Sequence, residues 1–175
     1  SADQTVKLWS TERQRQAEVM TNGPAHCRRF LLSPHGGTLA GLEEDVKLRL
    51  IPARIWLWDL ATHQPTLLAQ APSLWPEFYS DDRQTFFARG ELTSNGILPL
   101  LRWDLNAPTH PPKTTLLDLK ITNAVLNTVY TAHGPVYAVR QNGIQSISLW
   151  NPLTGEAVGL LRNEGLGLPK CFSPD

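Results

Sequence analysis

The residues best suited to catalysis in this chain are one Cys–His neighbour pair and two carboxylate clusters. His26 precedes Cys27, which are the residue types of a general base and a nucleophile. Neighbouring residues of a strand point to opposite faces, so we do not expect this pair to act together. The carboxylate clusters lie among other charges and therefore predict solvated loops rather than acid–base pairs; they are Glu43–Glu44–Asp45 and Asp81–Asp82.

Metal and cofactor chemistry has equally little support in the sequence. The other histidines all fall in predicted turns, with no spacing that would gather them as ligands; they are His35, His63, His110 and His133. Cys27 and Cys171 lie 144 positions apart without a Cys-x-x-Cys motif, and we expect both to be small buried hydrophobic residues. The chain has no Gly-x-Ser-x-Gly elbow and no phosphate-binding loop. We therefore expect no catalytic residues, no metal and no cofactor.

The composition excludes several classes of partner. The 175 residues carry 16 Lys plus Arg and 16 Asp plus Glu, so the formal net charge is zero. This balance gives no electrostatic reason to expect nucleic acid or an anionic membrane as the partner. No apolar run approaches the roughly 18 residues of a membrane helix. The 14 prolines, 12 glycines and 6 tryptophans indicate a turn-rich fold with an apolar core.

An internal repeat organises the whole chain. Four tryptophans recur at spacings of 49, 45 and 47 positions, each followed by Ser, Asp or Asn; they are Trp9, Trp58, Trp103 and Trp150. A second marker, an apolar pair running through Ser or Thr into a tight turn, recurs at Ser33, Ser80, Thr131 and Ser173. The two markers alternate strictly along the chain, which indicates duplication of one structural unit.

Between the markers the sequence predicts short strands that are covered on both faces. Apolar residues occupy adjacent positions at Phe86–Phe87 and at Trp56–Leu57–Trp58. A strand with one wet face would alternate more cleanly, so this pattern favours small sheets stacked against one another. Residues 11–20 are rich in good helix formers and contain no Gly or Pro, but their place in the repeat predicts a turn and an outer strand.

Two segments resemble the tryptophan–aspartate (WD) repeat family. SADQTVKLW (1–9) matches the family pattern at Ser1, Asp3 and Trp9, and SPHGGTLAG (33–41) matches its turn with His35 in the Asp position. The resemblance covers nearly the whole chain. It implies an all-β fold, a β-propeller whose blades are four-stranded antiparallel sheets arranged around a channel.

The resemblance also implies where the blades lie. We expect about three full blades and partial blades at both ends: 1–20, 27–71, 74–120, 123–162 and 166–175. Because the chain begins with Ser and its only methionine is Met20, we interpret it as part of a longer propeller whose remaining blades are missing here. The alternative is a closed ring of four blades, in which the C-terminal strand pairs with residues 1–20.

The chain departs from the family in the polar network that usually holds each blade. The Gly-His pair before the first strand is missing, so we expect the later blades to depend on packing. In this interpretation Trp58, Trp103 and Trp150 are structural, each burying its ring and offering its ring N–H to a neighbouring group.

Extra length is concentrated between the second and third strands of two predicted blades. The second marker precedes the tryptophan by 25 and 23 residues in these blades, against 19 in the third. The surplus gives the predicted loops 41–53 and 91–99, on the usual docking face of the family. Rigid scaffolds commonly bind through such loops, although insertions there can also be neutral. The predicted partner-binding residues are Glu43, Glu44, Asp45, Lys47, Arg49, Glu91, Ser94, Asn95 and Arg140.

The sequence thus predicts a non-catalytic interaction scaffold that binds a protein or peptide through its loop face. We expect it to act in the cytoplasm. One alternative is a regulatory propeller segment of a larger signalling protein, such as a kinase or an ATPase. Another is a propeller enzyme whose site lies outside this sequence.

Overall fold

The structure, a computed structural model, describes residues 6–8, 18–20, 24, 26–34, 36–44, 52–80, 84–131, 133–144 and 146–162. These residues form strands and turns, without a helix, and therefore contain no helix that could cross a membrane. The chain divides into two units, Ser1–Pro76 and Glu77–Asp175, each of which is described by itself.

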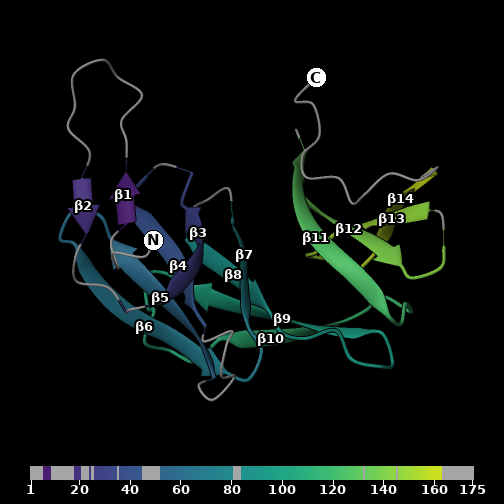
Figure 1. The fold of residues 1–175 in the computed structure, drawn as a ribbon, viewed down its shortest axis with the longest axis horizontal. Helices are drawn as coiled ribbons and strands as arrows, with labels where there is room; N and C mark the ends of the chain where they lie inside the picture. Colours follow the sequence, from purple (N-terminus) through teal and green to yellow (C-terminus); the bar gives the residue numbers. More distant parts are fainter. Residues whose placement is uncertain are drawn as a thin grey trace. The chain divides into compact units, whose positions relative to one another are not determined.

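The first unit contains one strand pair and one four-stranded sheet (Figure 1). β1 (Val6–Leu8) pairs with β2 (Glu18–Met20), so the expected outer strand is present at the end of the segment 11–20. The antiparallel sheet follows chain order and consists of β3 (Cys27–Leu32), β4 (Thr38–Glu43), β5 (Ala53–Asp59) and β6 (Gln64–Ala71).

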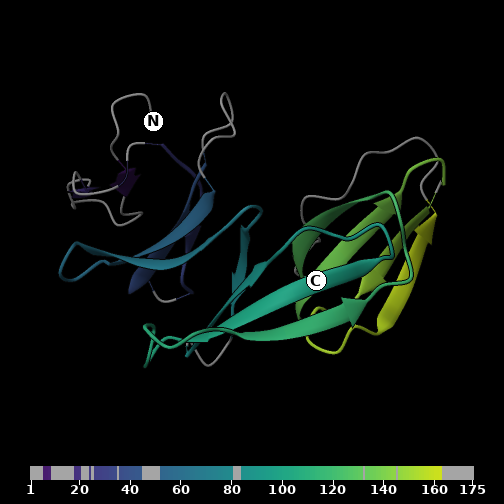
Figure 2. The ribbon, with the colours of Figure 1, turned by 90° about the horizontal axis from the view of Figure 1, so that it is seen from below.

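Two further four-stranded sheets, in the teal to yellow part of the ribbon, form the second unit (Figure 2). The boundary between the units falls within β7. One sheet consists of β7 (Trp75–Tyr79), β8 (Thr85–Arg89), β9 (Ile97–Asp104) and β10 (Lys113–Asp118). The other consists of β11 (Ala124–Thr131), β12 (Gly134–Gln141), β13 (Ser146–Trp150) and β14 (Ala157–Arg162). In each sheet every strand pairs with its neighbour in the sequence, which confirms the predicted all-β architecture.

A shared apolar core joins the two sheets of the second unit. Phe78 and Phe87 stack with ring centroids 4.6 Å apart, and they belong to the same buried cluster as Leu98, Tyr137 and Val139. Tyr137 and Val139 come from β12, whereas the other three come from β7, β8 and β9. The sheets are therefore packed face to face, which explains why the sequence shows apolar residues at adjacent strand positions.

The second repeated residue closes the turn between the first two strands of each sheet. Ser33 Oγ accepts a hydrogen bond from Thr38 N at 3.0 Å. Ser80 Oγ accepts one from Thr85 N at the same distance. Thr131 Oγ1 instead donates to the carbonyl oxygen of Gly134 at 3.0 Å. The repeated hydroxyl therefore stabilises its turn, because it forms a hydrogen bond with a backbone group that would otherwise bind water.

The residue after Trp58, after Trp103 and after Trp150 organises the next turn. Asp59 Oδ1 accepts hydrogen bonds from Ala61 N and Thr62 N, at 2.8 and 2.9 Å. The side chains of Asp104 and Asn151 accept equivalent bonds from backbone N–H groups two residues further on. These Asx turns explain why a short polar residue recurs at this place.

The repeated tryptophans are core residues, but their ring N–H groups are not used as predicted. Trp58 and Trp103 are each 1% exposed, and Trp150 is half-buried. The Nε1 atoms of all three are buried without a hydrogen-bond partner among the described residues. Their rings pack against apolar neighbours, as Trp103 does with Phe86 at a centroid distance of 6.0 Å. Trp9, with Ser1 and Asp3, lies outside the described residues.

Candidate functional site

The predicted partner-binding residues occupy different environments in the two units. In the first unit Glu43 ends β4 and Glu44 follows it, while Asp45, Lys47 and Arg49 lie outside the described residues. In the second unit Glu91, Ser94 and Asn95 are exposed in the loop between β8 and β9, and Arg140 is half-buried near the end of β12.

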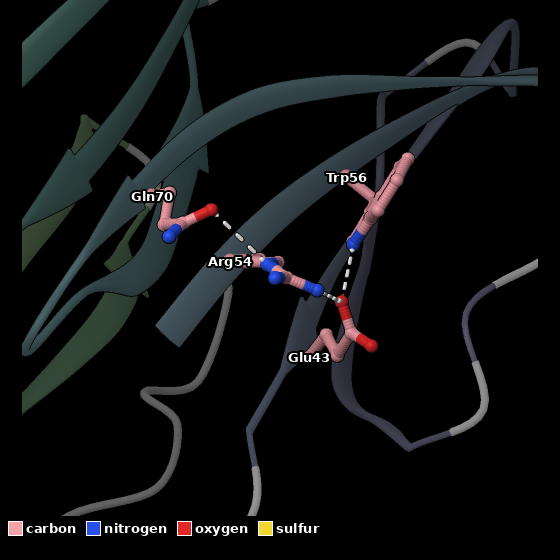
Figure 3. A network of polar contacts seen from close by, with 4 residues as sticks. All are labelled: Glu43, Arg54, Trp56 and Gln70. Carbon is pink, nitrogen blue, oxygen red and sulfur yellow. Dashed lines mark hydrogen bonds and ion pairs between the residues drawn. The ribbon is translucent and has the colours of Figure 1, made fainter. Parts of the chain in front are cut away.

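Glu43 was expected in a solvated loop, and this expectation is wrong. The residue is 8% exposed, and its Oε2 accepts a hydrogen bond from Trp56 Nε1 at 2.8 Å. Arg54 Nη1 lies 3.5 Å from the same oxygen (Figure 3). The reason is the strand register, because β4 continues through Glu43 and places it directly opposite Arg54. Opposed residues of an antiparallel pair share one face of the sheet, so their side chains meet.

The polar network in the first unit extends across three strands. Arg54 Nε donates a hydrogen bond to Gln70 Oε1 at 3.2 Å, and Gln70 lies opposite Arg54 in β6 (Figure 3). The Glu43 carboxylate is therefore bound by Trp56 and Arg54 of the same sheet. Trp56 was not singled out as a polar residue from the sequence, although its position two residues from Arg54 places both on the same face.

Cys27 lies opposite Glu43 in the ladder between β3 and β4. Burial, together with the nearby Glu43 carboxylate, raises the pKa of Cys27 to about 12. The thiol is therefore protonated at neutral pH, and a protonated thiol is a poor nucleophile. Its neighbour His26 is exposed.

In the second unit, two loops approach so closely that one position requires glycine. Leu119 N, which follows β10, donates a hydrogen bond to Gly96 O at 3.0 Å. Gly96 has a φ of +81°, and a Cβ added there would lie 2.8 Å from Ile121 N. Neither the conformation nor the space suits another residue. The loop between β8 and β9 is thus tied to the connection between β10 and β11.

A third loop joins the same surface through a pair of asparagines. Asn142 N donates to Asn123 O at 3.1 Å, and Asn142 Nδ2 donates to Asn123 Oδ1 at 3.0 Å. Asn123 has a φ of +51°, which asparagine tolerates better than most residues. We call the combined surface of residues 90–96, 119–123 and 140–144 the loop rim. It contains Glu91, Ser94, Asn95 and Arg140 of the predicted residues.

Two hollows of about 350 Å³ each lie on the loop rim. The first is lined by Leu92, Thr93, Ser94, Thr122, Asn123 and Ala124. The second is lined by Arg140, Gln141, Asn142, Gly143 and Ile144. Asn123 lines the first hollow and Asn142 the second, so the bonded asparagine pair connects them. The polar side chains among the lining residues are hydroxyls, amides and one guanidinium, which form hydrogen bonds but do not exchange protons near neutral pH.

A buried ion pair supports the base of the loop rim. Arg89 Nε lies 2.6 Å from Glu77 Oε1, and both side chains are almost entirely buried. Arg89 Nη1 also donates a hydrogen bond to Gly90 O at 3.3 Å, where the loop after β8 begins. Tyr137 packs nearby, and burial, followed by the Glu77 charge, raises the pKa of its hydroxyl. The charges of Arg89 and Glu77 therefore pair with each other inside the protein.

The residues that connect the loops were missed by sequence reasoning. Asn123 and Asn142 stand in connections of ordinary length, whereas the predicted binding loops were chosen for their extra length. The one local signal was the Asn142–Gly143 dipeptide, which is typical of tight turns. Among the described residues no group of three or more His, Cys, Asp or Glu side chains could hold a metal ion.

Solved structures share this architecture. TolB from Acinetobacter baumannii matches with a TM-score of 0.59 and 16% identity, over 87% of this chain and 36% of its own length. The β-propeller domain of the trilobed protease from Pyrococcus furiosus matches with a TM-score of 0.51 and 14% identity, over 82% of this chain and 44% of its own. The fold is a β-propeller. No protein-family model and no curated protein matches the sequence.

A third solved structure with a similar fold comes from a complex of two proteins. A chain of the nidogen/laminin complex matches with a TM-score of 0.52 and 11% identity, over 84% of this chain. This chain spans 36 to 51% of the length of the three solved chains. At these identities the likeness concerns the fold alone. In propeller terms the three four-stranded sheets are blades, and the loop rim joins the loops of the two blades in the second unit.

Proposed function

We propose that this chain is part of a WD-repeat propeller that binds a protein or peptide on the loop rim and does not itself catalyse a reaction. The observation that carries the proposal is the connection of three loops into one surface by backbone and side-chain hydrogen bonds, through Leu119–Gly96 and Asn142–Asn123. Such connections hold exposed polar groups in fixed positions, which lowers the entropy lost on binding.

The chemistry of the rim favours binding over catalysis. Its two hollows present neutral hydroxyls and amides together with the Arg140 guanidinium. No histidine or cysteine belongs to the loop rim. The WD-repeat assignment is supported by the turn-closing Ser or Thr and by the Asx turn after each repeated tryptophan. The nidogen/laminin match adds a propeller from a protein complex, whereas the protease match comes from an enzyme.

The test is partner capture with a rim variant and a matched control. Ser94→Tyr combined with Thr122→Tyr adds bulk at two exposed rim positions, and Thr109→Tyr adds the same group at an exposed turn residue outside the rim. We expect proteins captured by the full chain to be lost with the rim variant and retained with the control, with unchanged melting temperatures. Equal capture by all three proteins would contradict the proposal.

A further inference from the structure

The two cations of the loop rim region lack acidic partners. Arg140 and Lys120 form no ion pair among the described residues. Asp118 accepts a hydrogen bond from the backbone N of Lys120 at 3.1 Å, and so helps to fix the loop rather than pairing with the ammonium group. Glu91, in contrast, already interacts with another residue. The charge available to a ligand at this surface is therefore positive.

The second hollow combines this charge with an apolar side chain. Arg140 is half-buried and is held in the ladder opposite Val125. Ile144 is 48% exposed in the same hollow, and its N–H donates to Gln141 O at 3.2 Å, closing the turn. A half-buried guanidinium without a partner favours a carboxylate, which it can bind through two parallel hydrogen bonds. An apolar ligand group beside it would cover Ile144.

The first hollow offers a complementary, uncharged surface. Ser94, Thr122 and Asn123 are exposed there. Hydroxyls and amides both donate and accept hydrogen bonds, so they suit the alternating N–H and C=O groups of a peptide main chain. Because Asn123 is bonded to Asn142 of the second hollow, the two hollows hold a fixed relation to one another.

We propose that the loop rim binds an extended peptide segment that carries an acidic side chain next to an apolar one. The acidic group binds Arg140, the apolar group covers Ile144, and the main chain passes the asparagine pair to the first hollow. This inference rests on the proposed function and adds the chemistry of the partner. A segment with Lys or Arg at the same place is rejected because it would bring a second cation to Arg140.

The test uses pools of fluorescent ten-residue peptides with a fixed central dipeptide and degenerate flanks. The three pools contain Asp-Leu, Lys-Leu or Asp-Ser at the centre, and binding to the full chain is measured by fluorescence anisotropy. We expect the Asp-Leu pool to bind about tenfold more tightly than the Lys-Leu pool, and more tightly than the Asp-Ser pool. The preference for Asp over Lys should weaken as salt is added.

Two variants assign the preference to one residue. Arg140→Gln should remove the discrimination between Asp-Leu and Lys-Leu, and Arg140→Lys should restore part of it. Arg102→Gln removes an exposed cation from β9, which lines neither hollow, and should leave the discrimination unchanged. Circular dichroism establishes that each variant is folded.

The outcomes separate this inference from the proposed function. Peptide binding that the rim variant abolishes, but that shows no preference for Asp, would overturn the inference and leave the proposed function standing. A preference that survives Arg140→Gln would also overturn it. If no pool binds, the acidic-peptide inference fails, and partner capture by the rim variant then decides separately whether the proposed function fails as well.

Discussion

Replacing Gly41 with alanine should destabilise the protein even though alanine is ordinarily the better strand residue. Gly41 lies in β4, where a Cβ would stand 2.7 Å from Trp58 Cζ3, 3.0 Å from Trp58 Cη2 and 3.1 Å from Phe30 Cε1. Phe30 is 39% exposed and has room to move, whereas Trp58 is 1% exposed and cannot shift without disturbing its own neighbours. The Trp58 contact therefore decides the effect.

The expected cost follows from two opposing terms. Removing glycine from a strand interior gains about 0.5–1 kcal/mol, because the unfolded chain loses conformational freedom. Overpacking a closely packed core costs about 1–3 kcal/mol. Because 2.7 Å is much shorter than an ordinary carbon–carbon contact, we expect an overpacking cost toward the upper end of this range. We expect Gly41→Ala to lower the free energy of unfolding by about 1–2 kcal/mol.

Urea denaturation of the full chain, followed by tryptophan fluorescence, measures this change against a matched control. Gly37 precedes β4, and a Cβ there would meet no atom within 4 Å. Gly37→Ala should therefore leave the free energy of unfolding unchanged or raise it slightly. If Gly41→Ala is as stable as Gly37→Ala, the close packing of Trp58 over β4 is wrong.

Three further predictions concern the core, the loop rim and the Cys27 thiol, which is half-buried rather than fully buried as expected from the sequence. Trp103→Ala should lower the free energy of unfolding by about 3–5 kcal/mol in the same assay, and a loss under about 1 kcal/mol would contradict its place in the core. Gly96→Ala should weaken partner capture, and unchanged capture would argue against the close approach of the two rim loops. In a Cys171→Ser background, Cys27 should react slowly with iodoacetamide at pH 8, and Glu43→Gln should accelerate the reaction by lowering the pKa of Cys27. Because folding raises that pKa from 9.0 to about 12, the protein should lose stability as the pH rises through this range; a pH-independent melting temperature there would refute it.

The fold could be predicted from the sequence because the signals that define it are local and repeated. Alternating tryptophan and Ser or Thr markers predicted a repeated unit, its resemblance to the WD-repeat family implied four-stranded antiparallel sheets, and the structure confirms these sheets. Each marker forms its hydrogen bonds within a single turn, as Ser33 does with Thr38 and Asp59 does with Ala61. Interactions that span two to five residues require particular residue types at fixed spacings, so they can be recognised in the sequence.

The rest depends on which strands and loops meet in space. Glu43 became a buried partner of Arg54 and Trp56 because the register of β4 and β5 brings them together, and the loop length alone carried no such information. Asn123 and Asn142 are 19 residues apart, and they meet because the register of β11 and β12 places Ala124 opposite Gln141 and so brings the two asparagines together at the end of this ladder. Sequence pattern determined the repeating sheets, whereas tertiary packing decided which polar side chains are used inside the protein and which remain available to a partner.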